Sequence, residues 1–235
     1  MKKIIASLFI IFQLAANIYA QSDMLSAKDL LQNLSGLFQS KVKDFEADIT
    51  WSQDNTVSKG KIQFKNPQKV KISITSPVEQ VICTNGYNLW VYISSLNIVF
   101  KQELIQKEKV KDSSGKSQTV VNPLFINPVG YDRFLTEYSV DFNETKNKID
   151  YKDGSKVYTF KLLRWKSSKT GINTVILTVS DDGLMKKVEG ITVSGRKISM
   201  EMSSYKLNNG FGDMVFDYEP PAHANTVDNF INGQE

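Results

Sequence analysis

Residues that commonly carry catalysis are sparse in this chain of 235 residues. It holds one histidine, His223, which follows two prolines near the C-terminal end, and one cysteine, Cys83. No serine or cysteine motif is placed to use a lone histidine near a terminus as a general base. Strand-forming residues flank Cys83, so we expect a small buried hydrophobic residue rather than a reactive thiol. Asp181 and Asp182 precede a glycine and predict a turn, not a pair of catalytic carboxylates.

Cofactor and metal motifs are also missing from the sequence. Cys and His do not cluster at the spacing of zinc ligands, and no glycine-rich loop precedes a predicted helix to bind phosphate. The formal net charge of +4 is small for a nucleic-acid-binding protein, and no Lys/Arg run with interleaved aromatic residues occurs. We therefore expect no metal site, no cofactor, no nucleic-acid partner and no enzymatic activity.

The N-terminal segment predicts export. Lys2 and Lys3 precede an apolar run over residues 4–12, and small residues then lead to Ala20 and a polar segment. A basic start followed by an apolar stretch too short to span a bilayer is typical of a secretory signal peptide. We expect residues 1–20 to be the signal peptide and residues 21–235 to form one domain; the alternative is a retained membrane anchor. No cysteine occurs before Cys83, which argues against a lipid-anchored protein.

An amphipathic helix is the first element predicted after this segment. Ser26 and Asp29 give it a start that resembles a capping box. Its apolar residues recur at spacings of three and four with polar residues between them. These residues are Leu25, Leu30, Leu31, Leu34, Leu37, Phe38 and Val42. The apolar stripe needs a partner, either an ordinary core or the concave wall of a sheet.

From Phe45 onwards the apolar period changes to two, which predicts antiparallel strands with one solvated face. Asp181-Asp182-Gly183 and Asn208-Asn209-Gly210 predict hairpin connections. The strand patterns cover residues 45–51, 62–64, 70–74, 138–142, 157–162, 174–179, 187–193, 197–207 and 214–218. About ten strands in succession indicate one large antiparallel sheet, curved or closed.

One segment, residues 109–137, interrupts this pattern. The polar stretch 111–118 predicts a loop, and residues 120–135 show no strand alternation. Two prolines and a glycine divide the segment into short pieces, and the last piece, residues 131–137, is long enough for one or two helical turns. A packed crossover loop is the alternative interpretation.

Residues 60–92 carry a more specific pattern. One strand leads into Asn66-Pro67, an alternating strand ends at Ser76-Pro77, and a third strand precedes the turn at Asn85-Gly86 and the run Leu89-Trp90-Val91-Tyr92. Near the C-terminal end, Met214 to Pro221 are followed by Val227-Asp228. Together these stretches resemble the family of periplasmic lipoprotein carrier proteins (LolA) from bacteria with two membranes, over roughly residues 25 to 230.

The resemblance implies a mainly β fold with short helices, in which a curved antiparallel sheet forms an open half-barrel under a helical lid. It implies a monomeric periplasmic carrier that shields the acyl chains of lipoproteins in an apolar cavity and moves them from the inner to the outer membrane. The implied partners are acylated lipoproteins or lipids, an inner-membrane ATP-driven transporter and, if present, an outer-membrane receptor. A carrier of glycolipids or phospholipids and an envelope-stress sensing module are alternatives on the same fold.

The resemblance also suggests site residues. The candidate lipid-binding cavity comprises Trp51, Phe64, Val70, Ile72, Ile74, Trp90, Tyr92, Leu34 and Phe38. The alternation leaves open whether Leu89 and Val91 or Trp90 and Tyr92 face inwards. The lid is carried over to residues 123–135, with the apolar positions Pro123, Leu124, Phe125, Phe134 and Leu135.

A lid-gating position is implied as well. In the family, an arginine before the proline of the first sheet motif ties the lid to the sheet. The matching residue here is Asn66, which lacks the charge and the reach of arginine. Lys65 or Lys69 is the expected substitute.

Overall fold

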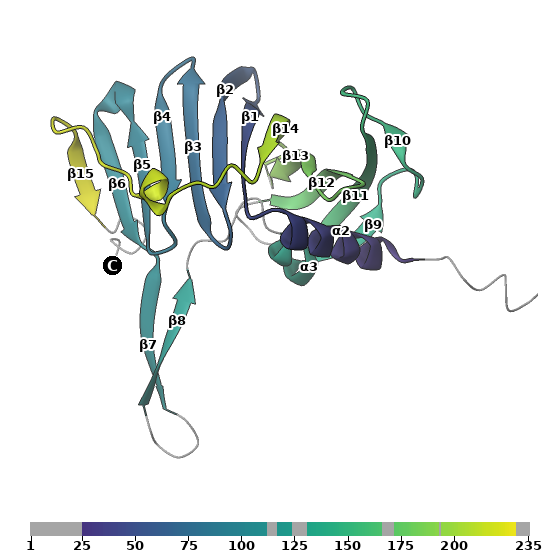
Figure 1. Ribbon diagram of the computed structural model, residues 1–235, viewed down its shortest axis with the longest axis horizontal. Coiled ribbons are helices and arrows are strands. Elements are labelled where there is room, and N and C mark those ends of the chain that lie inside the picture. The colour runs from purple at the N-terminus through teal and green to yellow at the C-terminus, as the bar shows by residue number, and fades with distance from the viewer. Residues whose placement is uncertain (1–24, 112–116, 124–130, 166–171, 193, 229–235) are drawn as a thin grey trace, which may run out of the picture.

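An open sheet dominates the computed structural model, which describes residues 25–111, 117–123, 131–165, 172–192 and 194–228. Thirteen strands belong to this sheet (Figure 1). In sheet order they are β10 (Ile149–Asp150), β11 (Lys156–Arg164), β12 (Ile172–Ser180), β13 (Met185–Thr192), β14 (Lys197–Leu207), β1 (Asp44–Gln53), β2 (Thr56–Lys65), β3 (Lys69–Ser76), β4 (Gln80–Thr84), β5 (Asn88–Ile93), β6 (Ile98–Glu103) and β15 (Asn225–Asp228), with β9 (Tyr138–Phe142) paired to β11. The two ends of this order do not pair with each other, so the sheet is not closed.

Helix α2 (Ala27–Lys41) confirms the predicted amphipathic helix. Its N-cap is Ser26, whose side chain accepts a hydrogen bond from the Asp29 amide over 3.1 Å. Leu31, Leu34 and Phe38 are buried against the sheet. Burying each such side chain stabilises the fold by roughly 1.5–3 kcal/mol, so packing outweighs intrinsic helix propensity here.

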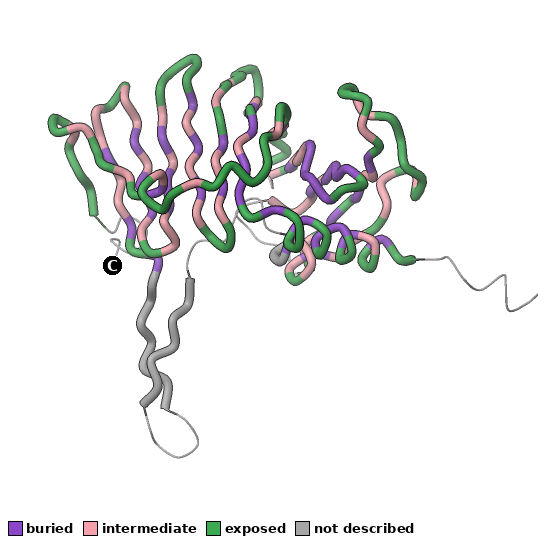
Figure 2. The backbone as a smooth tube through the Cα atoms, in the orientation of Figure 1, coloured by how far each residue is buried: buried purple, intermediate pink, exposed green. Residues whose placement is uncertain are grey.

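The sheet has an inner face, which we define as the face that carries Phe45 and Ile49 and packs against α2. On β1 these residues are 1% and 2% exposed, whereas Glu46 and Asp48 alternate with them on the opposite, outer face. One buried cluster on the inner face joins α2, β1, β2 and β3 to β11 and β12 (Figure 2). Because strands from both halves of the sheet meet in this cluster, the sheet curves around it.

A C-terminal segment, residues 208–228, runs across β1 to β6 on the outer face (Figure 1). It includes the short 3-10 helix η2 (Asp213–Phe216) and ends in β15, which pairs in parallel with β6. The strand predicted over residues 214–218 is therefore wrong. Phe216 is fully buried while Met214 is 86% exposed, and the two prolines that follow cannot donate ladder hydrogen bonds.

Residues 105–111 and 117–123 form a separate two-stranded ladder, where the sequence predicted a loop over residues 111–118 and no strand over residues 120–135. Strand β7 (Ile105–Lys111) pairs antiparallel with β8 (Ser117–Pro123), and both lie outside the main sheet. The sequences of the two strands, IQKEKVK and SQTVVNP, do not alternate apolar and polar residues, so the period-two pattern did not reveal them. Residues 112–116 lie outside the described residues.

The short helix predicted over residues 131–137 is confirmed as α3 (Asp132–Glu137). Another short 3-10 helix, η1 (Ser94–Leu96), connects β5 to β6. The expected signal peptide, residues 1–20, lies outside the described residues. Among the described helices, none is long and apolar enough to cross a membrane.

Candidate lipid-binding site

The inner face presents an apolar surface that continues across neighbouring strands. Strand register aligns Ile62, Ile72, Ile82, Val91 and Phe100 in one row over β2 to β6. Directly paired residues of antiparallel strands lie on the same face, so this row is one surface. Ile82, Val91 and Phe100 are only partly buried. The inner face of β4 to β6 therefore keeps apolar area in contact with solvent.

A groove of about 400 Å³ lies on this face near the β1–β2 turn. Its apolar walls are Trp51, Ile72, Ile74 and Ile82. The polar residues that also line it are Gln53, Asp54, Thr56, Ser58 and Gln80. Small-molecule sites span roughly 300–1,000 Å³ and combine apolar walls with a few polar groups, which is the composition found here.

Four of the expected cavity residues lie outside this groove, in the core under α2. Phe38 contacts Phe45 and Phe64 with ring centroids 6.2 and 5.9 Å apart. Leu34, Phe64 and Val70 are at most 3% exposed in the same cluster. Together with Trp51, Ile72 and Ile74 in the groove, they form one inner surface of which α2 covers one end.

Trp90 and Tyr92 do not lie on this surface. Their register partners are Cys83 and Val81, which occupy the outer face of β4. All four belong to a second buried cluster that the C-terminal segment covers. The open question about β5 is thereby settled: Leu89 and Val91 face inwards, and placing Trp90 and Tyr92 in the inner cavity was wrong.

Cys83 is buried in this second cluster, as expected. Its thiol donates a hydrogen bond to the Phe216 carbonyl over 3.3 Å. Burial raises the pKa of the Cys83 thiol to about 12. A thiol that stays protonated at neutral pH is a packing group and not a nucleophile.

The turn between β12 and β13 holds α2 against the sheet. Gly183 has a φ of +89°, and a Cβ added there would lie 2.5 Å from the Leu34 carbonyl oxygen. Only glycine allows this approach of the turn to the helix backbone. Tyr131, at the start of α3, donates its hydroxyl to the Gly183 carbonyl over 2.6 Å. Burial raises the pKa of Tyr131, which keeps this donor protonated.

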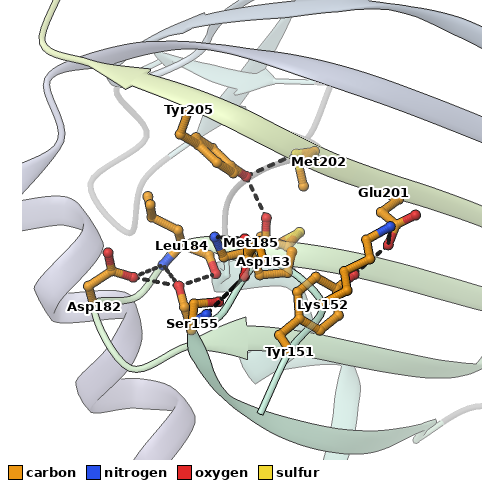
Figure 3. A network of polar contacts seen from close by, with 12 residues as sticks. Tyr151, Lys152, Asp153, Ser155, Asp182, Leu184, Met185, Glu201, Met202 and Tyr205 are labelled. Carbon is orange, nitrogen blue, oxygen red and sulfur yellow. Dashed lines mark hydrogen bonds and ion pairs between the residues drawn. The ribbon is translucent and has the colours of Figure 1, made fainter.

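Polar contacts fix this turn from its other side (Figure 3). The Leu184 amide donates to the hydroxyl of Ser180, and Tyr205 donates its hydroxyl to the Met185 carbonyl. The Lys186 ammonium, 10% exposed, pairs with Asp153 over 2.9 Å. Bonds from Ser155 and Lys186 hold the pKa of Asp153 well below its usual range. Sequence reasoning recognised the turn but not this network, whose members come from three strands (β12, β13 and β14) and from the loops that precede β11 and β13.

The structure places the expected lid residues in different parts of the molecule. Phe134 and Leu135 lie on α3 and pack, partly buried, against the inner cluster. Pro123 is instead the last residue of β8 in the separate two-stranded ladder, which corrects its assignment to a helical lid. Leu124 and Phe125 lie outside the described residues.

The expected lid-gating lysines contact another part of the molecule. Lys65 and Lys69 pair with Asp213 of the C-terminal segment over 2.6 and 2.9 Å. Hydrogen bonds from these two lysines lower the pKa of Asp213 to about 2. The backbone amide of Asn66 donates to the Lys43 carbonyl just after α2 over 2.8 Å. The residues next to Pro67 therefore anchor the C-terminal segment and the end of α2.

Comparison with known proteins decides the family. The family model described as outer membrane lipoprotein carrier protein LolA matches residues 38–219. The chain belongs to this family. Outer-membrane lipoprotein carrier proteins of Coxiella burnetii (strain CbuK_Q154) and Francisella tularensis (strain WY96-3418) are 25% and 22% identical to it. The first match covers 92% of both chains, and the second covers 97% of this chain and 98% of its relative.

A solved structure has a similar fold. An uncharacterized conserved protein from Thermus thermophilus superposes with a TM-score of 0.54 over 84% of this chain and 98% of its own, at 8% identity. That likeness concerns the fold alone. Within the described residues, no three His, Cys, Asp or Glu side chains are grouped to hold a metal ion. Membership of the LolA family supports a LolA-like carrier protein.

Proposed function

We propose that this protein carries lipoproteins through the periplasm by holding their acyl chains on the inner face of the sheet. The observation that carries this proposal is the groove walled by Trp51, Ile72, Ile74 and Ile82, which continues into the apolar row of β5 and β6. Family membership supports the carrier class. The lipoprotein cargo, the ATP-driven transporter that supplies it and the receptor that accepts it are parts of the proposal.

Simple energetics explain why a cavity is needed. Burying one CH2 group is worth roughly 0.8 kcal/mol, so a bilayer holds a chain of about fifteen such groups by on the order of 12 kcal/mol. Passage through water without a carrier is therefore negligibly slow. A carrier must offer comparable apolar area and still release the chain.

The groove of about 400 Å³ gives room for part of such a cargo. More room becomes available if α2 moves away, because Leu34 and Phe38 cover the inner face next to Phe64 and Val70. We infer that loading displaces α2 and that the contact at Gly183 limits how easily this happens. Such a cover has to be only modestly stable in its closed state, since a ligand shifts the equilibrium only by its differential affinity.

The test is recovery and transfer of acylated cargo. The protein is purified from cells and bound material is analysed by mass spectrometry, followed by transfer of a tripalmitoylated lipopeptide from vesicles. Ile74→Asp places a charge in the groove, while Thr75→Asp places the same charge on the outer face of the same strand. We expect bound acyl cargo, loss of transfer in Ile74→Asp and retention in Thr75→Asp. A protein that yields no lipid but a stoichiometric protein partner contradicts the proposal and favours a sensing module.

A further inference from the structure

The basic residues of strands β1 to β6 all lie on one side of the sheet. Lys61 is the register partner of Asp48 and Ser73, Lys71 of Cys83, and all of these lie on the outer face. The complete set in these six fully described strands is Lys59, Lys61, Lys65, Lys69, Lys71 and Lys101. The alternation that builds the apolar inner face of β1 to β6 therefore leaves no Lys or Arg residue on that face of these six strands.

The polar groups that line the groove are almost all uncharged. Gln53, Ser58 and Gln80 offer amide and hydroxyl groups, and Asp54, at the β1–β2 turn, is the only charged residue of the lining. Within the described part of the chain, Asp54 forms no ion pair. Lys197 borders a neighbouring hollow that Asp54 also lines, but it belongs to the outer face beside Ile191. A ligand in the groove therefore meets one carboxylate and no counter-charge for an anion.

We infer that the groove selects acyl chains whose polar head carries no negative charge, and that it discriminates against anionic phospholipids. This inference rests on the proposed carrier function and names its cargo class. Burying part of a phosphate without a cation or a set of backbone donors is costly, and Asp54 adds repulsion. Ester, hydroxyl and amide groups of an uncharged head find suitable partners in Gln80, Ser58 and Gln53.

A pair of lipids with identical chains tests the head group alone. Phosphatidylcholine vesicles carry either dipalmitoylglycerol or dipalmitoylphosphatidylglycerol at the same mole fraction, and lipid extracted by the delipidated protein is quantified. We expect the protein to favour the uncharged lipid by about tenfold, from charge repulsion together with unpaired phosphate oxygens. Asp54→Asn lowers this preference about two- to fourfold, since it removes only the repulsion.

Matched lysine substitutions localise the effect. Ser58→Lys and Gln80→Lys add a cation on the inner face, and Ser73→Lys adds one on the outer face of β3. We expect the first two to raise extraction of the anionic lipid several-fold and Ser73→Lys to leave the ratio unchanged. Circular dichroism checks that each variant folds. If one of the two inner variants does not fold, the other one provides the test.

The outcomes separate the two claims. Equal extraction of both lipids by the unaltered protein, or an equal change in the ratio for inner and outer lysine variants, overturns the head-group inference and leaves the carrier function standing. Extraction of neither lipid, together with no transfer of lipopeptide, overturns the carrier function and this inference with it.

Discussion

The hydroxyl of Tyr131 donates a hydrogen bond to the carbonyl oxygen of Gly183 over 2.6 Å. This bond joins the start of α3 to the turn on which α2 rests, and Phe38 of α2 packs edge-on against the Tyr131 ring at 6.0 Å. Three segments that are distant in the sequence thus meet at one glycine. Helix α2, the proposed cover of the inner face, is held at this point. Substitutions here are therefore expected to change how stably α2 packs on the sheet.

Gly183→Ala is expected to weaken the seating of α2. The added Cβ meets the Leu34 carbonyl at 2.5 Å in a backbone with φ of +89°. Gly195→Ala is the control, because its φ is +80° but its surroundings are empty. Backbone strain alone costs about 1–3 kcal/mol, so both variants lose stability and Gly183→Ala loses more. Thermal melting checks this, and equal melting temperatures would contradict the close contact.

Tyr131→Phe removes the hydroxyl and leaves the Gly183 carbonyl without this donor. Losing such a bond costs about 0.5–1.5 kcal/mol, which corresponds to a roughly two- to tenfold faster release of bound lipid if α2 must lift for exit. Stopped-flow displacement of a fluorescent fatty acid measures the rate. Tyr138→Phe, which removes a bond to Ile172 away from the turn, serves as the control. An unchanged release rate in Tyr131→Phe would argue against gating at this contact.

Cys83 is expected to resist alkylation in the folded protein. Its pKa of about 12 lies well above the ordinary value for cysteine, so at pH 8 the reactive thiolate is scarcer in the folded than in the unfolded chain. The free energy of unfolding is unaffected by this thiol at low and neutral pH. It falls as the pH rises above the unfolded pKa towards the folded one, because the unfolded thiol ionises first. Iodoacetamide labelling with and without denaturant measures this. Rapid labelling of the native protein would show that the C-terminal segment does not cover Cys83.

Asp213 is expected to make attachment of the C-terminal segment sensitive to acid. Its folded pKa of about 2 lies below the usual value of 3.8, so its contribution is present above about pH 4 and is lost as the pH falls through about 2. Protease cleavage within residues 208–224 over this pH range, with an acid-tolerant protease, measures detachment. Asp213→Asn is expected to be cleaved faster than the unaltered protein already at neutral pH. Asp48→Asn, an exposed residue of β1 with only a weak ion pair, is the control.

The curved sheet could be predicted from periodicity because one face of each strand is wet. Phe45, Ala47 and Ile49 alternate with charged residues, and each apolar one is buried as expected. On β5, periodicity could not show which residues face inwards. Both faces are covered or apolar there, since the C-terminal segment packs on Trp90 and Tyr92, so four consecutive large residues carry no alternation.

Contacts between distant segments could not be predicted from local pattern. Lys65 and Lys69 looked like substitutes for a lid-gating arginine, and only the path of the C-terminal segment shows that Asp213 is their partner. Gly183 was recognised as a turn residue, but its role depends on the backbone of α2, which packs there only after the sheet has formed. The lipid-binding role of Trp51, Ile72 and Ile74 stays a prediction.

Site-specific photocrosslinking to acylated cargo tests the central claim most directly. A photoreactive amino acid is placed at Ile74 on the inner face or at Ser73 on the outer face of the same strand, and the protein is loaded with a tripalmitoylated lipopeptide. We expect crosslinks to the acyl chains from position 74 and none from position 73. Crosslinking from position 73 alone, or from neither position under conditions where cargo is bound, would contradict an acyl-binding inner face.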